Sequence, residues 1–159
     1  MKIIKSISAV LIATVIIASC SKKPDVEYTS TVNMSGEWFT RYYTGGAAIT
    51  SFHKISTYNT SDPTSNQVWV DDLGLWPFKS KIDVDYSSLL FKAMASTPND
   101  EITGETVKVI EGKVLKGMGL SKSGNTVDSI YLKLEFSDDP GTEYEIRGHQ
   151  RTGFFEDEY

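Results

Sequence analysis

Hydrophobic and polar residues alternate along most of the chain from about Ser35 onward, a pattern typical of strands with one buried face. The clearest example spans residues 78–86, where Phe78, Ile82 and Val84 share one parity and charged residues occupy the other. Residues 128–136 repeat this alternation. We therefore expect a chain built from β-strands, each with an apolar face turned toward a common core.

We predict eight strands, over residues 37–44, 51–60, 67–72, 78–86, 88–94, 106–117, 128–136 and 142–154. Turn-forming clusters such as SDPTSN, STPNDEITGE and SDDPG separate them, and a change of parity near Gly112 predicts a β-bulge. No segment carries a convincing helical period. Short connections between successive strands favour an all-β fold with a single antiparallel up-and-down β-barrel. An eight-stranded, lipocalin-like barrel has just enough room for one small ligand.

The start of the chain follows a different pattern. Lys2 and Lys5 precede an apolar run from Ile7 to Ala18, which is shorter than the roughly 20 residues of a membrane-spanning helix. A basic start, a short apolar run and small residues before a cut are the layout of a secretory signal. Ser19 and Cys20 follow the run, and this junction resembles the lipobox of bacterial lipoproteins. The resemblance implies cleavage before Cys20 and a diacylglycerol on its sulfur.

The alternative is an ordinary signal peptide that leaves an unpaired cysteine. On the lipoprotein interpretation, residues 1–19 are the signal peptide, 20–34 a lipidated tether and 35–159 the barrel domain. Two or more acyl chains on Cys20 give stable attachment to a membrane. We expect a protein anchored by lipid to the outer membrane, on its periplasmic face or at the cell surface.

Charge narrows the choice of partners. The chain has 16 Lys and Arg against 21 Asp and Glu. Loss of Lys2 and Lys5 with the signal would leave 14 against 21, a formal charge of −7. An acidic domain without basic stripes is a poor candidate for nucleic-acid binding. With Cys20 lipidated, no disulfide can form within the chain, and we expect a monomer stabilised by its core alone.

Aromatic residues are the main candidates for ligand contact. We predict that five of them converge at the barrel mouth around a small apolar ligand such as a lipid: Trp38, Tyr42, Tyr58, Trp69 and Trp76. Apolar walls with a few polar groups are typical of ligand sites. The alternative is that these side chains fill the barrel, as they do in many small barrels.

The first and last predicted strands carry a possible closure. Gly36-Glu37-Trp38 opens the first strand, and the last carries Arg147 and Arg151. This is similar to the lipocalin arrangement, in which a late arginine covers a tryptophan at the closed end of the barrel. An arginine stacked on Trp38 would form a cation–π pair and seal the base. The alternative is that Trp38 is an ordinary core residue.

Four stretches together resemble a known family: SGEW, TYNTSDP, VWVDDLGLWPFKSKIDVD and DSIYLKLEFSDDPGTEYEIRGHQRTGF. The family is the lipid-binding putative hydrolase lipoproteins of Bacteroidetes-type bacteria, and the resemblance runs from about Ser35 to Tyr159. It implies a lipocalin-like barrel, a binding role and a hydrolase label.

The residues themselves give the hydrolase label little support. The chain has two histidines, His53 and His149, and GLSKSG lacks the glycine spacing of a nucleophile elbow. Cys20 is excluded as a nucleophile by its lipid. Two acidic pairs, 71–72 and 138–139, are interpreted as turn residues, with a Ca²⁺ site as the alternative.

We therefore expect no cofactor and no metal, and we favour non-catalytic binding of a lipid or another small apolar ligand. Two alternatives stay open. One is a surface module that docks a partner or a glycan, and the other is a hydrolase of unknown substrate.

Overall fold

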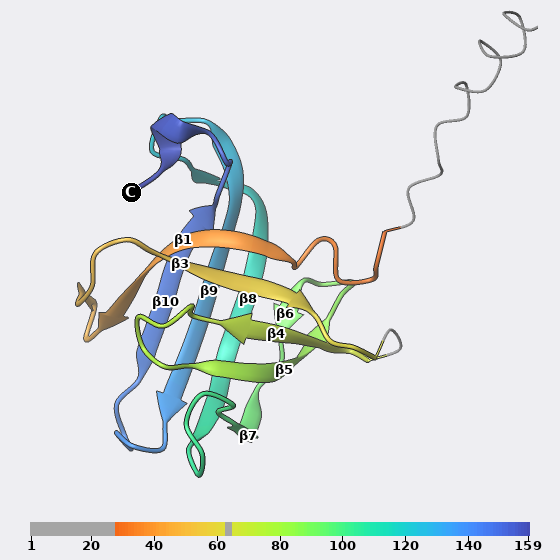
Figure 1. Cartoon of the computed structure of the whole chain (residues 1–159), viewed down its shortest axis with the longest axis vertical. Coiled ribbons are helices and arrows are strands. Elements are labelled where there is room, and N and C mark those ends of the chain that lie inside the picture. The colour runs from red at the N-terminus through yellow and green to blue at the C-terminus, as the bar shows by residue number, and fades with distance from the viewer. Residues whose placement is uncertain (1–27, 63–64) are drawn as a thin grey trace, which may run out of the picture.

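The structure is a computed structural model that describes residues 28–62 and 65–159. The predicted signal (1–19), Cys20 and the first part of the predicted tether lie outside the described residues. Within the described residues, no helix is long and apolar enough to cross a membrane. Ten strands and one 3-10 turn make up the regular structure of this part of the chain (Figure 1).

The elements, in chain order, are β1 (Gly36–Thr44), β2 (Ala47–Ala48), β3 (His53–Asn59), β4 (Gln67–Asp71), β5 (Lys79–Asp85), β6 (Leu90–Phe91), β7 (Met94–Pro98), β8 (Thr106–Leu120), β9 (Thr126–Phe136), β10 (Tyr144–Gln150) and η2 (Phe155–Asp157).

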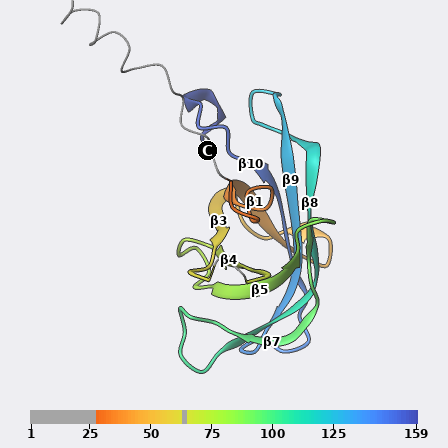
Figure 2. The same cartoon turned by 90° about the vertical axis from the view of Figure 1, so that its right-hand side faces the viewer.

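Eight of the strands form a closed antiparallel ring in the order β1-β3-β4-β5-β6-β8-β9-β10, and β10 pairs back onto β1. The strands β2 and β7 lie outside the ring and pair with β1 and β8. Figure 2 shows β8, β9 and β10 as one wall of the barrel, with β3, β4 and β5 on the other side. The predicted all-β fold, a single up-and-down barrel of about eight strands, is confirmed.

The region after β5 differs from the prediction. The strand expected over 88–94 is divided into β6 and β7, and β7 extends into the segment 96–105 that was expected to be a loop. Polar side chains explain the error. Thr97 Oγ1 donates to the Lys81 carbonyl at 2.9 Å, and Ser80 Oγ donates to the Pro98 carbonyl at 2.6 Å. Side-chain hydrogen bonds thus hold a sequence of turn-forming residues beside β5.

The bulge predicted near Gly112 is confirmed. The register of β8 against β9 shifts between Val109 and Glu111, before Gly112. Gly112 has a different role, since a Cβ atom there would lie 2.6 Å from Leu132 Cδ2 and 3.1 Å from Phe91 Cβ. The glycine therefore leaves room inside the barrel for two larger side chains.

Apolar side chains fill the barrel interior. Twelve of the largest are less than 2% exposed: Trp38, Tyr42, Phe78, Met34, Ile55, Ile82, Ile130, Leu132, Leu134, Ile146, Val68 and Val70. Two polar side chains among them are satisfied, because Trp38 Nε1 donates to Thr57 Oγ1 at 2.9 Å and Thr57 Oγ1 donates to the Met34 carbonyl at 2.6 Å. Met34 belongs to this core, so packing onto the barrel begins within the last residues of the segment predicted as tether.

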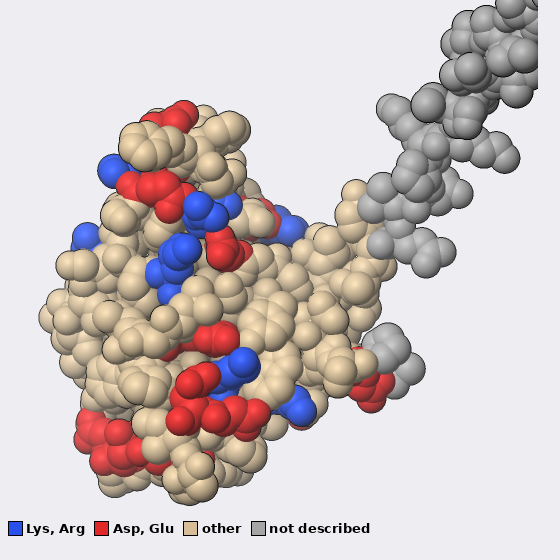
Figure 3. All heavy atoms as spheres, viewed as in Figure 1, with Lys and Arg blue, Asp and Glu red and all other residues tan. Residues whose placement is uncertain are grey.

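The outer surface carries charges of both signs, which Figure 3 shows interspersed on one face. Several pair across neighbouring strands. Lys108 Nζ lies 2.9 Å from a Glu135 carboxylate oxygen, and Lys133 Nζ lies 2.5 Å from one of Glu143. Exposed pairs of this kind contribute about 0–1 kcal/mol each, so the apolar core carries most of the stability.

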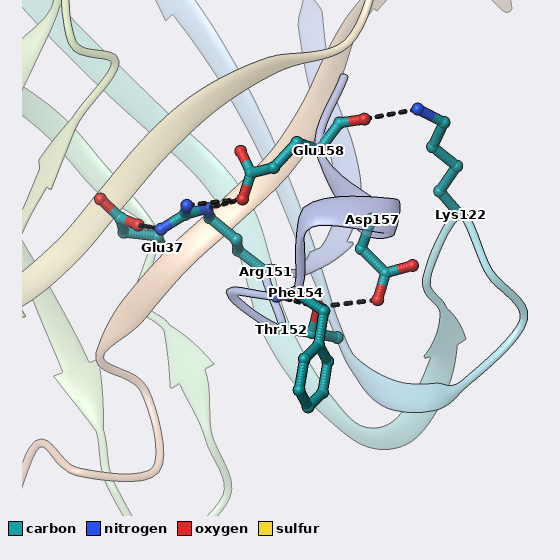
Figure 4. Close-up of polar contacts among 7 residues, drawn as sticks. All are labelled: Glu37, Lys122, Arg151, Thr152, Phe154, Asp157 and Glu158. Carbon is teal, nitrogen blue, oxygen red and sulfur yellow. Dashed lines mark hydrogen bonds and ion pairs between the residues drawn. The ribbon is translucent and has the colours of Figure 1, made fainter.

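The C-terminal residues 151–159, here called the strap, bind to the outside of the barrel (Figure 4). Arg151 Nη1 lies 2.6 Å from Glu37 on β1, and Arg151 Nε donates to Glu158 at 2.6 Å. The Asp157 carboxylate accepts hydrogen bonds from the Ser123 amide and the Thr152 hydroxyl, both at 2.7 Å. These hydrogen bonds hold the pKa of Asp157 well below its usual range.

Tyr159 completes the contact between strap and wall. Its ring centroid lies 4.9 Å from that of Phe39 and 4.2 Å from that of Phe52, and its hydroxyl is 3.1 Å from His149 Nε2. Phe39 points outward from β1 and yet is only 3% exposed. The strap therefore covers an apolar area on the outer wall and joins β1, β10 and the β8–β9 turn.

Candidate functional site at one end of the barrel

A loop side chain fills one end of the barrel. Residues 72–78 connect β4 to β5, and the indole of Trp76 points from this loop into a group of inward-facing rings. Its centroid lies 5.0 Å from that of Tyr144, 5.7 Å from that of Phe136 and 5.8 Å from that of Tyr42. We call the side chains of Tyr42, His53, Asp72, Trp76, Phe136 and Tyr144 the mouth cluster.

Asp72 fixes the loop in this position. The residue is 1% exposed, and its carboxylate accepts hydrogen bonds from the amides of Gly74 at 3.0 Å and Trp76 at 2.6 Å. The Tyr42 hydroxyl donates a third bond at 3.3 Å. Burial raises the pKa of Asp72, although these hydrogen bonds oppose the rise. Burial and the neighbouring carboxylate together raise the pKa of Tyr42 well above its ordinary value.

His53 adds a second polar group to the cluster. Its ring stacks on Tyr42 with centroids 5.3 Å apart and planes 11° apart. Its Nε2 lies 3.4 Å from Thr40 Oγ1, and its Nδ1 lies 3.5 Å from the Ser51 carbonyl oxygen. Burial lowers the pKa of His53 below its ordinary value of 6.5, so the imidazole is mostly neutral at pH 7.

The loop that carries Trp76 is strained and apolar. Leu73 adopts a φ of 58°, a left-handed conformation that is uncommon for residues other than glycine. Leu73 and Leu75 are 51% and 50% exposed. Backbone strain of this kind concentrates at ligand clamps and switch regions. The loop thus places apolar side chains in solvent directly beside the filled end of the barrel.

The structure brings together two of the five predicted ligand-binding residues, Tyr42 and Trp76. Trp38 lies deeper, in the core, and Tyr58 and Trp69 lie on the outer face of β3 and β4, opposite each other in the register. Their partners are charged: Tyr58 donates to Asp71 at 2.9 Å, and Lys81 Nζ lies 4.8 Å from the Trp69 ring centroid.

Strand parity explains this separation. Val68 and Val70 are fully buried, and successive side chains on a strand point to opposite faces, so Trp69 between them must point outward. The same argument applies to Tyr58, which follows the buried Thr57.

The two arginines predicted to close the barrel also lie outside it. Arg147 lies over the Tyr43 ring, with its guanidinium carbon 4.8 Å from the centroid, and pairs with Glu145. Arg151 joins Glu37 to the strap. Among the described residues, neither arginine stacks on Trp38. The cation–π pair of β10 therefore forms on the outer wall, with Tyr43 as its aromatic member.

Four members of the mouth cluster were not predicted as site residues: His53, Asp72, Phe136 and Tyr144. Asp72 was interpreted as a turn residue, and its bond to the Gly74 amide is indeed of the Asx-turn type. Its second role, accepting the hydroxyl of Tyr42, joins residues 30 positions apart. Local sequence carries no signal for such a contact.

The geometry around both histidines bears on hydrolysis. His149 lies near the Tyr159 hydroxyl and, at 3.2 Å, the Gln150 carbonyl. Among the hydrogen bonds of the described residues, neither histidine contacts a serine hydroxyl or a carboxylate, as a serine hydrolase requires. Within the same residues, no group of three or more His, Cys, Asp or Glu side chains could hold a metal ion. Of the acidic pair 138–139, for which a Ca²⁺ site was the alternative to a turn, Asp139 accepts a hydrogen bond from the Tyr144 hydroxyl at 2.6 Å.

Comparison of the sequence with known families gives a match. The sequence profile described as lipid-binding putative hydrolase matches residues 23–155, which is most of the chain. The chain belongs to this family. A search of curated proteins finds no match. The resemblance to the lipid-binding putative hydrolase family is thus confirmed, whereas the bacterial group and the lipoprotein anchor stay predictions. The lipid-binding part of the family's description fits a β-barrel with an aromatic cluster at one end.

Proposed function

We propose that this protein is a membrane-anchored lipoprotein that binds a small apolar ligand, a lipid, at the mouth of its barrel. The observation that carries the proposal is the position of Trp76, a loop residue packed among the inward-facing rings of three strands. A side chain on a loop can leave such a position without breaking the barrel. The ligand would take its place.

The physical basis is the exchange of one apolar group for another. The ligand loses contact with water, which contributes about 25 cal/mol for each Å² of apolar surface buried. Phe136 and Tyr144 form the wall against which it packs, and the Tyr42 hydroxyl and the His53 imidazole orient it, as a few polar groups do in most ligand sites. The remainder of the barrel is filled by side chains, so the ligand occupies only the mouth.

Replacing Trp76 with alanine tests the proposal. Because the ligand no longer has to displace the indole, Trp76→Ala should bind a neutral apolar dye such as phenylnaphthylamine about tenfold more tightly than the unaltered chain. A fluorescence titration gives the two dissociation constants. Trp69→Ala is the matched control, since it removes the same side chain from the outer wall and should leave binding unchanged. Equal effects of the two substitutions would contradict a site at the mouth.

The anchor is the second part of the proposal, and the layout of residues 1–20 supports it. Mass spectrometry of the mature protein should find a chain that begins at Cys20 and carries acyl groups there. Cys20→Ser should move the protein from the outer-membrane fraction to the soluble fraction. A mature chain that retains residues 1–19, or one with an unmodified Cys20, would contradict the lipoprotein assignment.

A further inference from the structure

A hollow of about 470 Å³ lies on the outer wall of the barrel, between β5, β6, β8 and β9. Its apolar lining includes Leu90, Ala93, Ile110 and Tyr131. This volume falls within the range of about 300–1,000 Å³ that is typical of small-molecule sites. A second hollow of about 340 Å³ shares Ala93 and Ile110 with it and continues along β7. We call the two together the wall groove.

The register shows why apolar side chains face solvent here. Phe91 and Gly112 point into the barrel, so the neighbouring Leu90 and Lys113 point outward, opposite each other. Tyr131 lies opposite Lys113 on the next strand. The exposed fraction of Leu90 is 43%. The strand β6 is only two residues long, so few neighbouring side chains of this strand cover the hollow.

Two lysines, Lys92 and Lys113, line the same hollow. Among the described residues, neither ammonium group has an ion pair or a hydrogen bond to a side chain. The two acidic residues of the lining already have donors. Glu111 accepts the Tyr131 hydroxyl at 3.0 Å, and Asp85 accepts bonds from Ser87 and Ser88 that lower its pKa to about 2. The groove therefore offers an apolar floor with two unpaired cations, and the carboxylates of Asp85 and Glu111 beside them keep their negative charge.

We propose that the wall groove is a second ligand site, which binds a single acyl chain with an anionic head group. The chain would lie along Leu90, Ile110 and the continuation toward β7. The head group would accept charge-assisted hydrogen bonds from Lys92 and Lys113. This site differs from the mouth in both position and chemistry, and it stands whether or not the mouth binds lipid.

The test compares decanoate with decanol, which share a chain length and differ in head-group charge. The protein is the mature chain, residues 20–159, with Cys20→Ser, so that no acyl anchor competes and every described residue is kept. Calorimetry should show that the double variant Lys92→Met, Lys113→Met binds decanoate about a hundredfold more weakly, or tenfold for each lysine, with little change for decanol. Lys54→Met, on the outer face of β3, is the control and should bind both as before.

NMR locates the binding. Decanoate should shift the backbone amide signals of Leu90 and Tyr131, both in the unaltered chain and in Trp76→Ala. Leu90→Asn should weaken both ligands, since it removes part of the apolar floor. The proposal is overturned if decanoate shifts only the mouth signals or none, if the double lysine variant binds it normally, or if that variant loses decanol equally.

Discussion

Gly148→Ala should destabilise the barrel more than alanine at any other glycine, by about 3 kcal/mol or more. Gly148 lies on β10 opposite Thr40 of β1, at the seam where the ring closes. A Cβ atom there would lie 2.0 Å from the Phe39 carbonyl oxygen and 2.7 Å from Thr40 Cα. Both are backbone atoms, which cannot rotate away, so β10 would have to separate from β1.

Urea denaturation of Gly148→Ala measures this effect, and Gly124→Ala provides the comparison. Gly124 lies in the β8–β9 turn with a φ of 89° and no atom within 4 Å of the added methyl group. Its substitution costs only the strain of a left-handed backbone, about 1 kcal/mol. If Gly148→Ala proves no more costly than Gly124→Ala, the closed ring is contradicted at its seam.

Asp72→Ala should lower the free energy of unfolding by about 3 kcal/mol, because three donors, one of them fully buried, lose their acceptor at once. These donors are the amides of Gly74 and Trp76 and the hydroxyl of Tyr42. Asp72→Asn keeps one acceptor oxygen, that of its amide, and should lower the free energy of unfolding by less than half as much. Thermal or urea unfolding distinguishes the two variants. Equal losses would show that the hydrogen bonds to Asp72 do not hold the loop.

The pH dependence of Asp72→Asn follows from the raised pKa of Asp72. A carboxyl group whose pKa is higher in the folded than in the unfolded state binds protons more tightly when folded. The free energy of unfolding of the wild-type chain therefore falls as pH rises from about 3.9, the pKa of an unfolded Asp, through the higher pKa of Asp72 in the folded state. Asparagine does not titrate, so the free energy of unfolding of Asp72→Asn should rise relative to that of the wild-type chain across that pH range. If the difference in free energy of unfolding between Asp72→Asn and the wild type does not change with pH, the raised pKa of Asp72 is contradicted.

Alternation along 78–86 and 128–136 was enough to predict the barrel, because each strand there has one face in the core and one in water. It failed at β7, a strand of turn-forming residues that pairs with β8 on one side and is held to β5 by side-chain hydrogen bonds on the other. The end of the chain, FFEDEY, contains no strand pattern, yet Tyr159 packs firmly on Phe39 and Phe52. That packing depends on a distant surface, which a local pattern cannot describe.

The site was predictable only in part, for a related reason. Aromatic content pointed to Tyr42 and Trp76, whereas the parity of β3 and β4 would have placed Tyr58 and Trp69 on the outer wall. Asp72 and His53 gain their roles from Tyr42, which comes from a separate strand. A cluster assembled from β1, β3, the 72–78 loop, β9 and β10 becomes visible only when the ring is closed.

The three tryptophans make the central claim directly measurable, since each lies in a different environment. Trp38 is in the core, Trp69 on the outer wall and Trp76 at the mouth. Fluorine NMR of the protein labelled with fluorotryptophan should give three signals, which Trp→Phe variants assign. On addition of phenylnaphthylamine, the account predicts that the Trp76 signal moves toward its position in water while those of Trp38 and Trp69 stay in place. A bound dye that leaves the Trp76 signal unmoved would contradict ligand binding at the mouth.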